Sequence, residues 1–298
     1  MNDCSIYEST VMSPLDILSN IAIVFGASFF LFLPLELWER KRDGTLTWTS
    51  VAEMAASASP LLGVIALNGL VMAFIAGLFT FFSGLVPWSV ETSFASAAVC
   101  LILTDFLYFI DHYCGHRFRF YWAISHSVHH SSPQFDQTTA LRISAVDGFT
   151  SPWFLAPALL IGFDPLLILA CYSVVLAYQQ WIHTETIGSL GIFDAIFNSP
   201  SNHRVHHGSD DVYLDRNYGG ILIIWDRIFG TYQHEERKPT YGLVTPLDSL
   251  NPIEVHLHEA KKLFRDVRAS RSWGEISHHL FARPGEPFAW AGPKHGDK

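Results

Sequence analysis

The chain has 298 residues, of which 49% are hydrophobic and only 16% are charged, and its formal net charge is −9. Soluble domains carry about 25% charged residues on average, so the low charge indicates a protein embedded in a membrane. The negative net charge argues against a nucleic-acid partner, because nucleic-acid-binding surfaces are basic. The four cysteines have no paired spacing, so they predict neither a disulfide framework nor a zinc finger.

Three apolar stretches are long enough to cross a bilayer, which requires about 20 residues. They cover residues 17–35, 61–82 and 94–110. Basic residues at 40–42 follow the first stretch, whereas the loop at 84–93 after the second contains no Lys or Arg. Because cytosolic loops are enriched in Lys and Arg, the chain is predicted to start outside the cytosol, and the third stretch to end on the cytosolic side.

A further apolar block at residues 151–180 is interrupted at 162–165 by Gly-Phe-Asp-Pro. Such a break predicts a helical hairpin, and its two short limbs favour a re-entrant hairpin over two full crossings. Since the hairpin enters and returns, His183 lies on the same side as the end of the third stretch. The expected fold class is an all-α integral membrane protein with about three full transmembrane helices, one helical hairpin and a cytosolic, histidine-lined helical cap.

Nine of the fifteen histidines fall into spaced groups on the predicted cytosolic side. The spacing H-x-x-x-H occurs once and H-x-x-H-H twice, and on a helix both spacings put the imidazoles on one face. The nine candidate metal ligands are His112, His116, His126, His129, His130, His183, His203, His206 and His207. Imidazole binds iron, copper and zinc, whereas magnesium and calcium prefer oxygen ligands. Since a catalytic zinc takes about three protein ligands, nine candidates predict two metal ions.

The almost purely histidine composition of these groups favours iron over a hydrolytic zinc pair, since hydrolytic dinuclear sites rely more on carboxylates. Neighbouring polar residues are candidates to orient the ligands, because metal-bound histidines usually donate their second ring N–H to a carboxylate or carbonyl. These candidates are Asp111, Glu185, Asn202, Asp210, Asp211 and Asp215, of which the first three are preferred.

Four segments carry a resemblance to a known family. They are DFLYFIDHYCGH (105–116), HSVHHSSPQFDQTTALR (126–142), WIHTE (181–185) and NHRVHHGSDDVYLDRNYGGILIIWDRIFGTY (202–232). With these motifs the chain resembles the fatty acid hydroxylase and sterol desaturase superfamily of membrane diiron enzymes. It departs from the usual motifs at Tyr113, where Arg is more common, and at Gln179 and Ile187, where some relatives have a further histidine.

The resemblance implies a helical membrane unit with two iron ions in a histidine-lined site. The implied reaction is O2-dependent hydroxylation of an alkylglycerol, fatty acyl or sterol lipid, and lipid desaturation at the same diiron site is the alternative. The implied reductant is external, either tetrahydrobiopterin or an electron donor of the cytochrome b5 or ferredoxin type. The expected partners are therefore a lipid from the bilayer, O2 and a soluble or membrane electron donor.

The implied organisation is a single membrane domain over residues 1–298 with a fatty acid hydroxylase-like core at 95–245. Residues 246–298 are expected to form an amphipathic helix and a tail that is loosely ordered beyond Ser270. The site is expected on the cytosolic side of a bacterial inner membrane or an endoplasmic reticulum membrane, and nothing in the sequence predicts the oligomeric state. A membrane metal-transport or metal-storage protein is the competing class, but its ligands would lie along the spans rather than at their ends.

Overall fold

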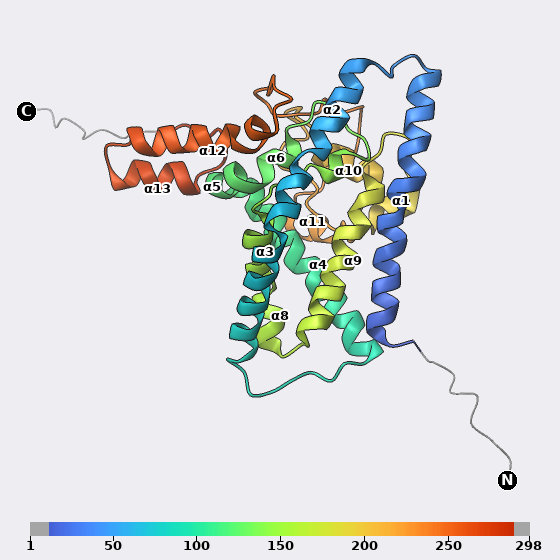
Figure 1. Ribbon diagram of the computed structural model, residues 1–298, viewed down its shortest axis with the longest axis vertical. Coiled ribbons are helices and arrows are strands. Elements are labelled where there is room, and N and C mark those ends of the chain that lie inside the picture. The colour runs from blue at the N-terminus through green and yellow to red at the C-terminus, as the bar shows by residue number, and fades with distance from the viewer. Residues whose placement is uncertain (1–11, 289–298) are drawn as a thin grey trace, which may run out of the picture.

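The computed structural model describes residues 12–288, and over this range the chain is all-helical (Figure 1). The β-type pairings in this range are two isolated bridges, Phe197–Leu222 and Gly208–Tyr241. Four helical stretches of the described chain are long and apolar enough to cross a membrane: α1 (Pro14–Arg42), α2 with α3 (Trp48–Ser83), α4 (Phe94–Arg117) and α9 (Pro165–Ile182). The expected all-α membrane protein is therefore confirmed.

The first three spans begin where the sequence offers helix caps. Ser13, Thr47 and Ser93 each accept a hydrogen bond from the backbone N–H three residues further on, and they form capping boxes at α1, α2 (Trp48–Ala58) and α4. After α2 the chain passes through Ser59 into α3 (Pro60–Ser83). The last turn of α1 holds the basic residues at 40–42, which complement the negative end of the helix dipole.

The apolar block before His183 forms an unequal hairpin. Its first limb consists of α7 (Asp147–Thr150), the 3-10 helix η3 (Ser151–Leu155) and α8 (Ala156–Ile161). This limb is broken into short pieces because Pro152 and Pro157 cannot donate backbone hydrogen bonds. Gly162 ends α8 at φ 99°, and Asp164 caps α9. Since α9 is long enough to span a membrane, the second limb is longer than expected.

The hydrophobic core lies between α4, α8 and α9, and α9 also packs against α1. Cys100 of α4 and the α9 residues Ile168 and Cys171 have no exposed surface. The outer faces instead expose large apolar side chains: Phe30 of α1 is 79% exposed and Leu62 of α3 is 71% exposed. Soluble proteins rarely expose such extended apolar faces, so these faces indicate contact with lipid.

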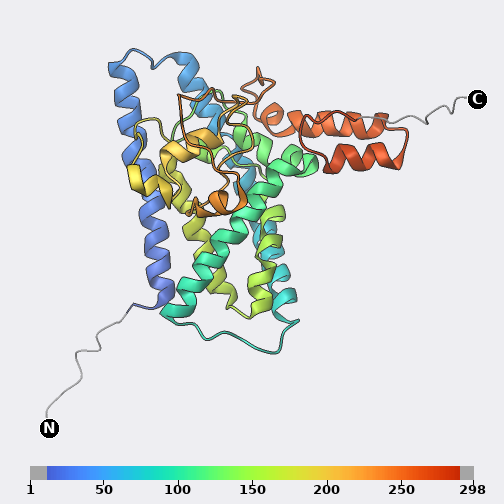
Figure 2. The ribbon, with the colours of Figure 1, turned by 180° about the vertical axis from the view of Figure 1, so that it is seen from behind.

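Short helical segments gather at the end of the bundle where α4 and α9 finish (Figure 2). They are α5 (Arg119–Tyr121), the π-helix η1 (Trp122–His126), α6 (Ser127–His130), η2 (Thr139–Leu141), η4 (Gly191–Ala195), α10 (Pro200–His206) and α11 (Ile224–Phe229). Together with the last turns of α4 and the residue after α9, these segments carry the histidine motifs. The fold therefore brings three stretches that are distant in sequence to one end of the bundle.

The C-terminal part forms a hairpin of α12 (Pro252–Ala269) and α13 (Trp273–Phe281) that projects sideways from the bundle (Figure 1). The expectation of a loosely ordered chain beyond Ser270 is therefore wrong for α13. Ser272 caps α13, and the guanidinium of Arg119 pairs with Asp266 on α12 and with His279 on α13. These contacts tie the hairpin to α5, whereas residues 289–298 lie outside the described range.

Candidate metal centre

The nine histidines are presented by helix ends. His112 and His116 lie on the last two turns of α4, and His126 ends the π-helix η1. Single π-turns are frequent at functional sites because the extra residue redirects the side chains that follow. His129 and His130 follow in α6.

The second set comes from α9 and α10. His183 is the residue directly after α9, and His203 and His206 lie in α10. The side chain of Ser199 caps α10, and Pro200 occupies the first turn of this helix, where its missing N–H costs no hydrogen bond. His207 is the C-cap residue of α10.

The structure brings the nine imidazoles into two groups, within each of which one ligand atom per residue lies within 4.8 Å of all the others. The five-histidine group contains His112, His116, His126, His130 and His206, and the four-histidine group contains His129, His183, His203 and His207. Each H-x-x-H-H motif is therefore divided between the groups. Its first and last histidines, four residues apart on one helix face, stay together, and its middle histidine joins the other group.

Backbone carbonyls fix the orientation of four rings. His112 Nδ1 lies 2.8 Å from Tyr218 O and His206 Nδ1 lies 2.9 Å from Arg216 O. In the other group, His183 Nδ1 lies 2.7 Å from Gln179 O and His129 Nδ1 lies 3.3 Å from Arg142 O. A carbonyl only accepts hydrogen bonds, so each Nδ1 carries the proton and each Nε2 keeps a lone pair.

These lone pairs face one another. His183 Nε2 lies 3.2 Å from His129 Nε2, and both nitrogens are acceptors, so two neutral rings cannot form a hydrogen bond there. His203 Nε2 lies 2.9 Å from His183 Nε2. Two nitrogens that bind one metal ion at about 2.1 Å and at right angles are about 3.0 Å apart. The four-histidine group thus has the spacing of ligands that share a cation.

The five-histidine group has the same spacing. His126 Nε2 lies 2.9 Å from His112 Nε2 and 3.1 Å from His130 Nε2, which in turn lies 3.1 Å from His206 Nε2. His116 Nε2 and, in the other group, His207 Nε2 are buried ring nitrogens without a hydrogen-bond partner among the described residues. Buried polar atoms are normally satisfied, so these nitrogens also fit a metal site.

For the seven imidazoles that lie outside α4, a lowered pKa favours the neutral form, which is the form that binds a metal. Removal from water is the main cause, and the neighbouring rings add to it, since a charged imidazole would face others like it. Burial lowers the pKa of His129 to about 4. The pKa values of His126, His130, His183, His203, His206 and His207 lie well below the usual range for the same reason.

The loop at residues 215–218 contacts three histidines of the five-histidine group. The Asp215 carboxylate lies 3.6 Å from His116 Nδ1, and the carbonyls of residues 216 and 218 are the acceptors for His206 and His112. Asp215 and Asn217 have φ values of 57° and 56°, in the left-handed region that non-glycine residues rarely adopt. The buried Asn217 side chain donates to Asn202 O and Gln233 O, which holds the loop in this conformation.

Asp226 supports the same loop from α11. Its carboxylate oxygens accept the backbone N–H groups of Tyr218 and Gly219, each at 2.7 Å. Burial raises the pKa of Asp226 to about 6, so the side chain is ionised at neutral pH. Replacing Asp226 by Asn would put an NH2 group against a backbone N–H. We expect this variant to lose about 1–3 kcal/mol of stability.

Thermal unfolding of the detergent-solubilised protein measures this loss. The control is Asp211→Asn, which removes the same charge from an exposed position nearby. Equal unfolding temperatures for the two variants would contradict the role given to Asp226.

The three preferred orienting residues bind elsewhere. The Asp111 carboxylate accepts from Tyr121 OH, Glu185 pairs with Lys238 and Tyr241, and the Asn202 amide donates to Asp194 O and Phe197 O. The acceptors observed for the ring N–H groups are instead four backbone carbonyls. Every residue carries a backbone carbonyl, so no side-chain pattern in the sequence indicates which carbonyls accept the ring N–H hydrogen bonds.

The fold and the site define an all-helical membrane protein with a buried polyhistidine centre. Residues 97–231, which include all nine histidines, match the family model described as fatty acid hydroxylase. The chain therefore carries a fatty acid hydroxylase domain, and the resemblance inferred from the motifs is confirmed.

Three relatives illustrate the range of the similarity. The chain is 37% identical to the alkylglycerol monooxygenase of Homo sapiens over 200 residues, which cover 67% of this chain and 44% of the relative. It is 26% identical to the ornithine lipid hydroxylase of Rhizobium tropici, and the match covers 74% of this chain and 66% of the relative. It is 27% identical to a Delta(7)-sterol 5(6)-desaturase of Candida albicans, and the match covers 57% of this chain and 41% of the relative.

The chain spans less than half of the length of the human alkylglycerol monooxygenase. No solved structure matches it.

Proposed function

We propose that this protein is an O2-dependent, non-haem diiron membrane oxidoreductase that hydroxylates a lipid. The five-histidine group would hold one iron ion and the four-histidine group the other. The chemistry supplied by iron in such a site is reductive activation of O2 and attack on a C–H bond. The observation that carries the proposal is the 3.2 Å contact between His129 Nε2 and His183 Nε2, whose lone pairs face each other.

The chain itself orients the ligands and keeps water away from them. The carbonyls at residues 142, 179, 216 and 218 direct one nitrogen of each partner ring towards its group. His183, His203 and His206 are at most 3% exposed. Exclusion of water protects reactive oxygen chemistry from side reactions with solvent.

The substrate class we propose is a lipid of the alkylglycerol, fatty acyl or sterol type that enters laterally from the bilayer. The similarity to an alkylglycerol monooxygenase and to an ornithine lipid hydroxylase supports hydroxylation. Lipid desaturation at the same site is the second candidate, and the similarity to a sterol desaturase favours it. Metal transport gains no support, because the two histidine groups found among residues 12–288 lie at the ends of the spans.

We place the site on the cytosolic side of a bacterial inner membrane or an endoplasmic reticulum membrane. The support is the basic cluster at the end of α1, which follows the pattern of cytosolic loops. The catalytic core would cover residues 95–245, and residues 246–298 would be an appended amphipathic helix and tail. The reductant would be external: tetrahydrobiopterin, or a cytochrome b5 or ferredoxin-type donor.

Metal analysis together with a lipid assay tests this proposal. Purified protein should contain two irons per chain and should consume O2 only when lipid and a reductant are present. A product that gains one oxygen atom supports hydroxylation, whereas one that loses two hydrogen atoms supports desaturation. Tightly bound zinc with an activity that does not depend on O2 would overturn the proposal.

A further inference from the structure

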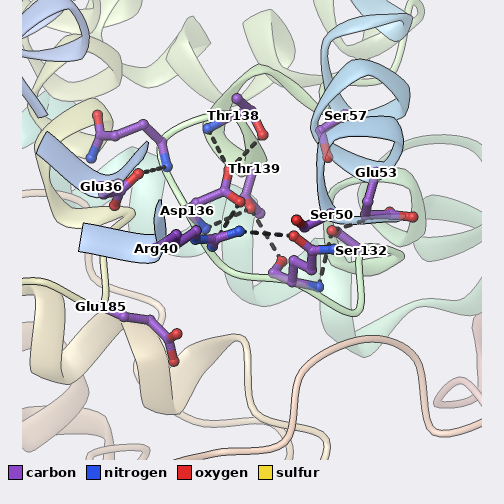
Figure 3. Close-up of polar contacts among 12 residues, drawn as sticks. Glu36, Arg40, Ser50, Glu53, Ser57, Ser132, Asp136, Thr138, Thr139 and Glu185 are labelled. Carbon is purple, nitrogen blue, oxygen red and sulfur yellow. Dashed lines mark hydrogen bonds and ion pairs between the residues drawn. The ribbon is translucent and has the colours of Figure 1, made fainter. Parts of the chain in front are cut away.

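The two histidine groups are supported by different parts of the chain. The five-histidine group depends on the loop at 215–218, which Asp226 holds. Buried carboxylates of α1 and α2, which precede the family-matched residues 97–231, contact Gln137, Arg142 and Thr184, which lie near His129 and His183 in the chain. Figure 3 shows Glu36 and Glu53 on opposite sides of the segment that carries Ser132, Asp136 and Thr139. Resting on the proposed function, we propose that Glu53 of α2 and Glu36 of α1 are positioning residues for the metal ion of the four-histidine group alone.

Glu53 acts through Arg142. The Arg142 side chain is 1% exposed, and its Nη1 donates to Glu53 Oε1 at 2.6 Å. The same guanidinium donates to Ser131 Oγ at 2.8 Å and to Ser57 Oγ of α2 at 3.2 Å. These bonds fix both ends of the segment from residue 131 to residue 142. The carbonyl of Arg142 is the one that accepts the Nδ1 proton of His129.

The positive charge of the buried Arg142 side chain makes the orientation of His129 depend on the Glu53 carboxylate. A buried guanidinium that loses its carboxylate is left as an uncompensated charge away from water. Arg142 would then have to move towards solvent or towards another acceptor. Its backbone carbonyl would move with it, and the His129 ring would lose the acceptor that sets its orientation. Outer partners of this kind typically contribute about 10–100-fold to metal affinity.

Glu36 acts on the other side of the same group. Its carboxylate accepts from Thr184 Oγ1 and from the backbone N–H of Gln137, the latter at 3.0 Å. The Gln137 side chain donates to the carbonyl of His183 at 3.0 Å. Glu36 thus holds both Thr184, the neighbour of His183 in the chain, and Gln137, the residue that binds the His183 backbone.

Glu36 and Glu53 do not contact the loop that orients two rings of the five-histidine group. The acceptors for His112 and His206 lie in the loop at 215–218, and Glu36 and Glu53 make no hydrogen bond to that loop among the described residues. A loss of these carboxylates should therefore weaken one metal site and leave the other.

Titration of the full-length, metal-free protein with Co²⁺ in detergent tests the inference. The wild-type chain should bind two ions. Glu53→Gln, which keeps the size of the side chain and removes its charge, should bind one ion as before and the second about 10–100-fold more weakly. The matched control is Asp226→Asn. It also removes a buried carboxylate, but one that supports the loop of the five-histidine group.

Combination with ligand variants identifies the weakened site. Glu53→Gln added to His183→Ala should cause no further loss of Co²⁺, because both changes act on the four-histidine group. Glu53→Gln added to His206→Ala should weaken both sites. Asp226→Asn should cause no further loss of Co²⁺ when added to His206→Ala, and it should weaken both sites when added to His183→Ala. The d–d absorption of the remaining Co²⁺ provides a spectroscopic signature that separates the two sites without an activity assay.

Equal weakening of both sites by Glu53→Gln, or weakening of the five-histidine site alone, would overturn the inference. If Glu53→Gln does not fold, Glu36→Gln must give the same selective pattern, and a non-selective loss there overturns the inference as well. A wild-type chain that binds fewer than two ions would overturn the proposed function, and the inference with it. This outcome is read from the wild-type titration alone, so it is distinguishable from a failure of the inference, which is read from the variants.

Discussion

Replacing His129 or His206 by alanine should reduce lipid oxidation to the level seen without protein. Each replacement removes one imidazole from a different group, and bound iron should fall from two ions per chain to about one. Neither loss can be covered by a neighbouring ring, because the other two histidines of the same H-x-x-H-H motif already belong to the opposite group. Iron content and product formation by mass spectrometry measure the two effects.

His234→Ala is the control for this experiment. His234 is exposed and belongs to neither group, so iron content and product formation should stay at the wild-type level. Full activity with two bound irons in His206→Ala would refute the ligand assignment of the five-histidine group. The same result in His129→Ala would refute that of the other group.

The spacing of the histidines predicted that they would gather at one end of the bundle. Residues four apart on a helix share a face, and the end of each apolar span places the first histidine at the end of the bundle. The division of each H-x-x-H-H motif between two groups could not be predicted. It depends on α6 and α10 lying so that each helix contributes ligands to both groups, which is a matter of tertiary packing.

The supporting contacts were beyond prediction for a different reason. Arg142 and Glu53 are 89 positions apart in sequence, so the sequence does not indicate which carboxylate pairs with the Arg142 guanidinium. The conformation of Asn217 has no strong sequence signal either, since Asn adopts positive φ only occasionally. Helix α13 was missed because its nine residues, which include a Gly and two His, have weak intrinsic helix preference, and its packing on α12 and α5 stabilises it.

Metal-free protein should unfold at a temperature on the order of 10 °C lower than metal-loaded protein. A ligand at about a thousand times its dissociation constant stabilises the folded state by about 4 kcal/mol per site, and each kcal/mol corresponds to a few degrees for a chain of this size. The effect should be large here because removing the metal leaves buried nitrogens such as His116 Nε2 and His207 Nε2 without a partner. Differential scanning fluorimetry in detergent, before and after chelation, measures the shift.

The choice of added metal separates a specific site from general salt effects. Fe²⁺, Co²⁺ or Zn²⁺ should restore the higher unfolding temperature, since imidazole binds all three, whereas Mg²⁺ should not, since it requires oxygen ligands. Removing one ligand from each group in His183→Ala with His206→Ala should abolish most of the restoration. An unfolding temperature that does not respond to Fe²⁺, Co²⁺ or Zn²⁺ would contradict the metal centre. It would mean that the facing lone pairs of His129 and His183 are satisfied by something other than a cation.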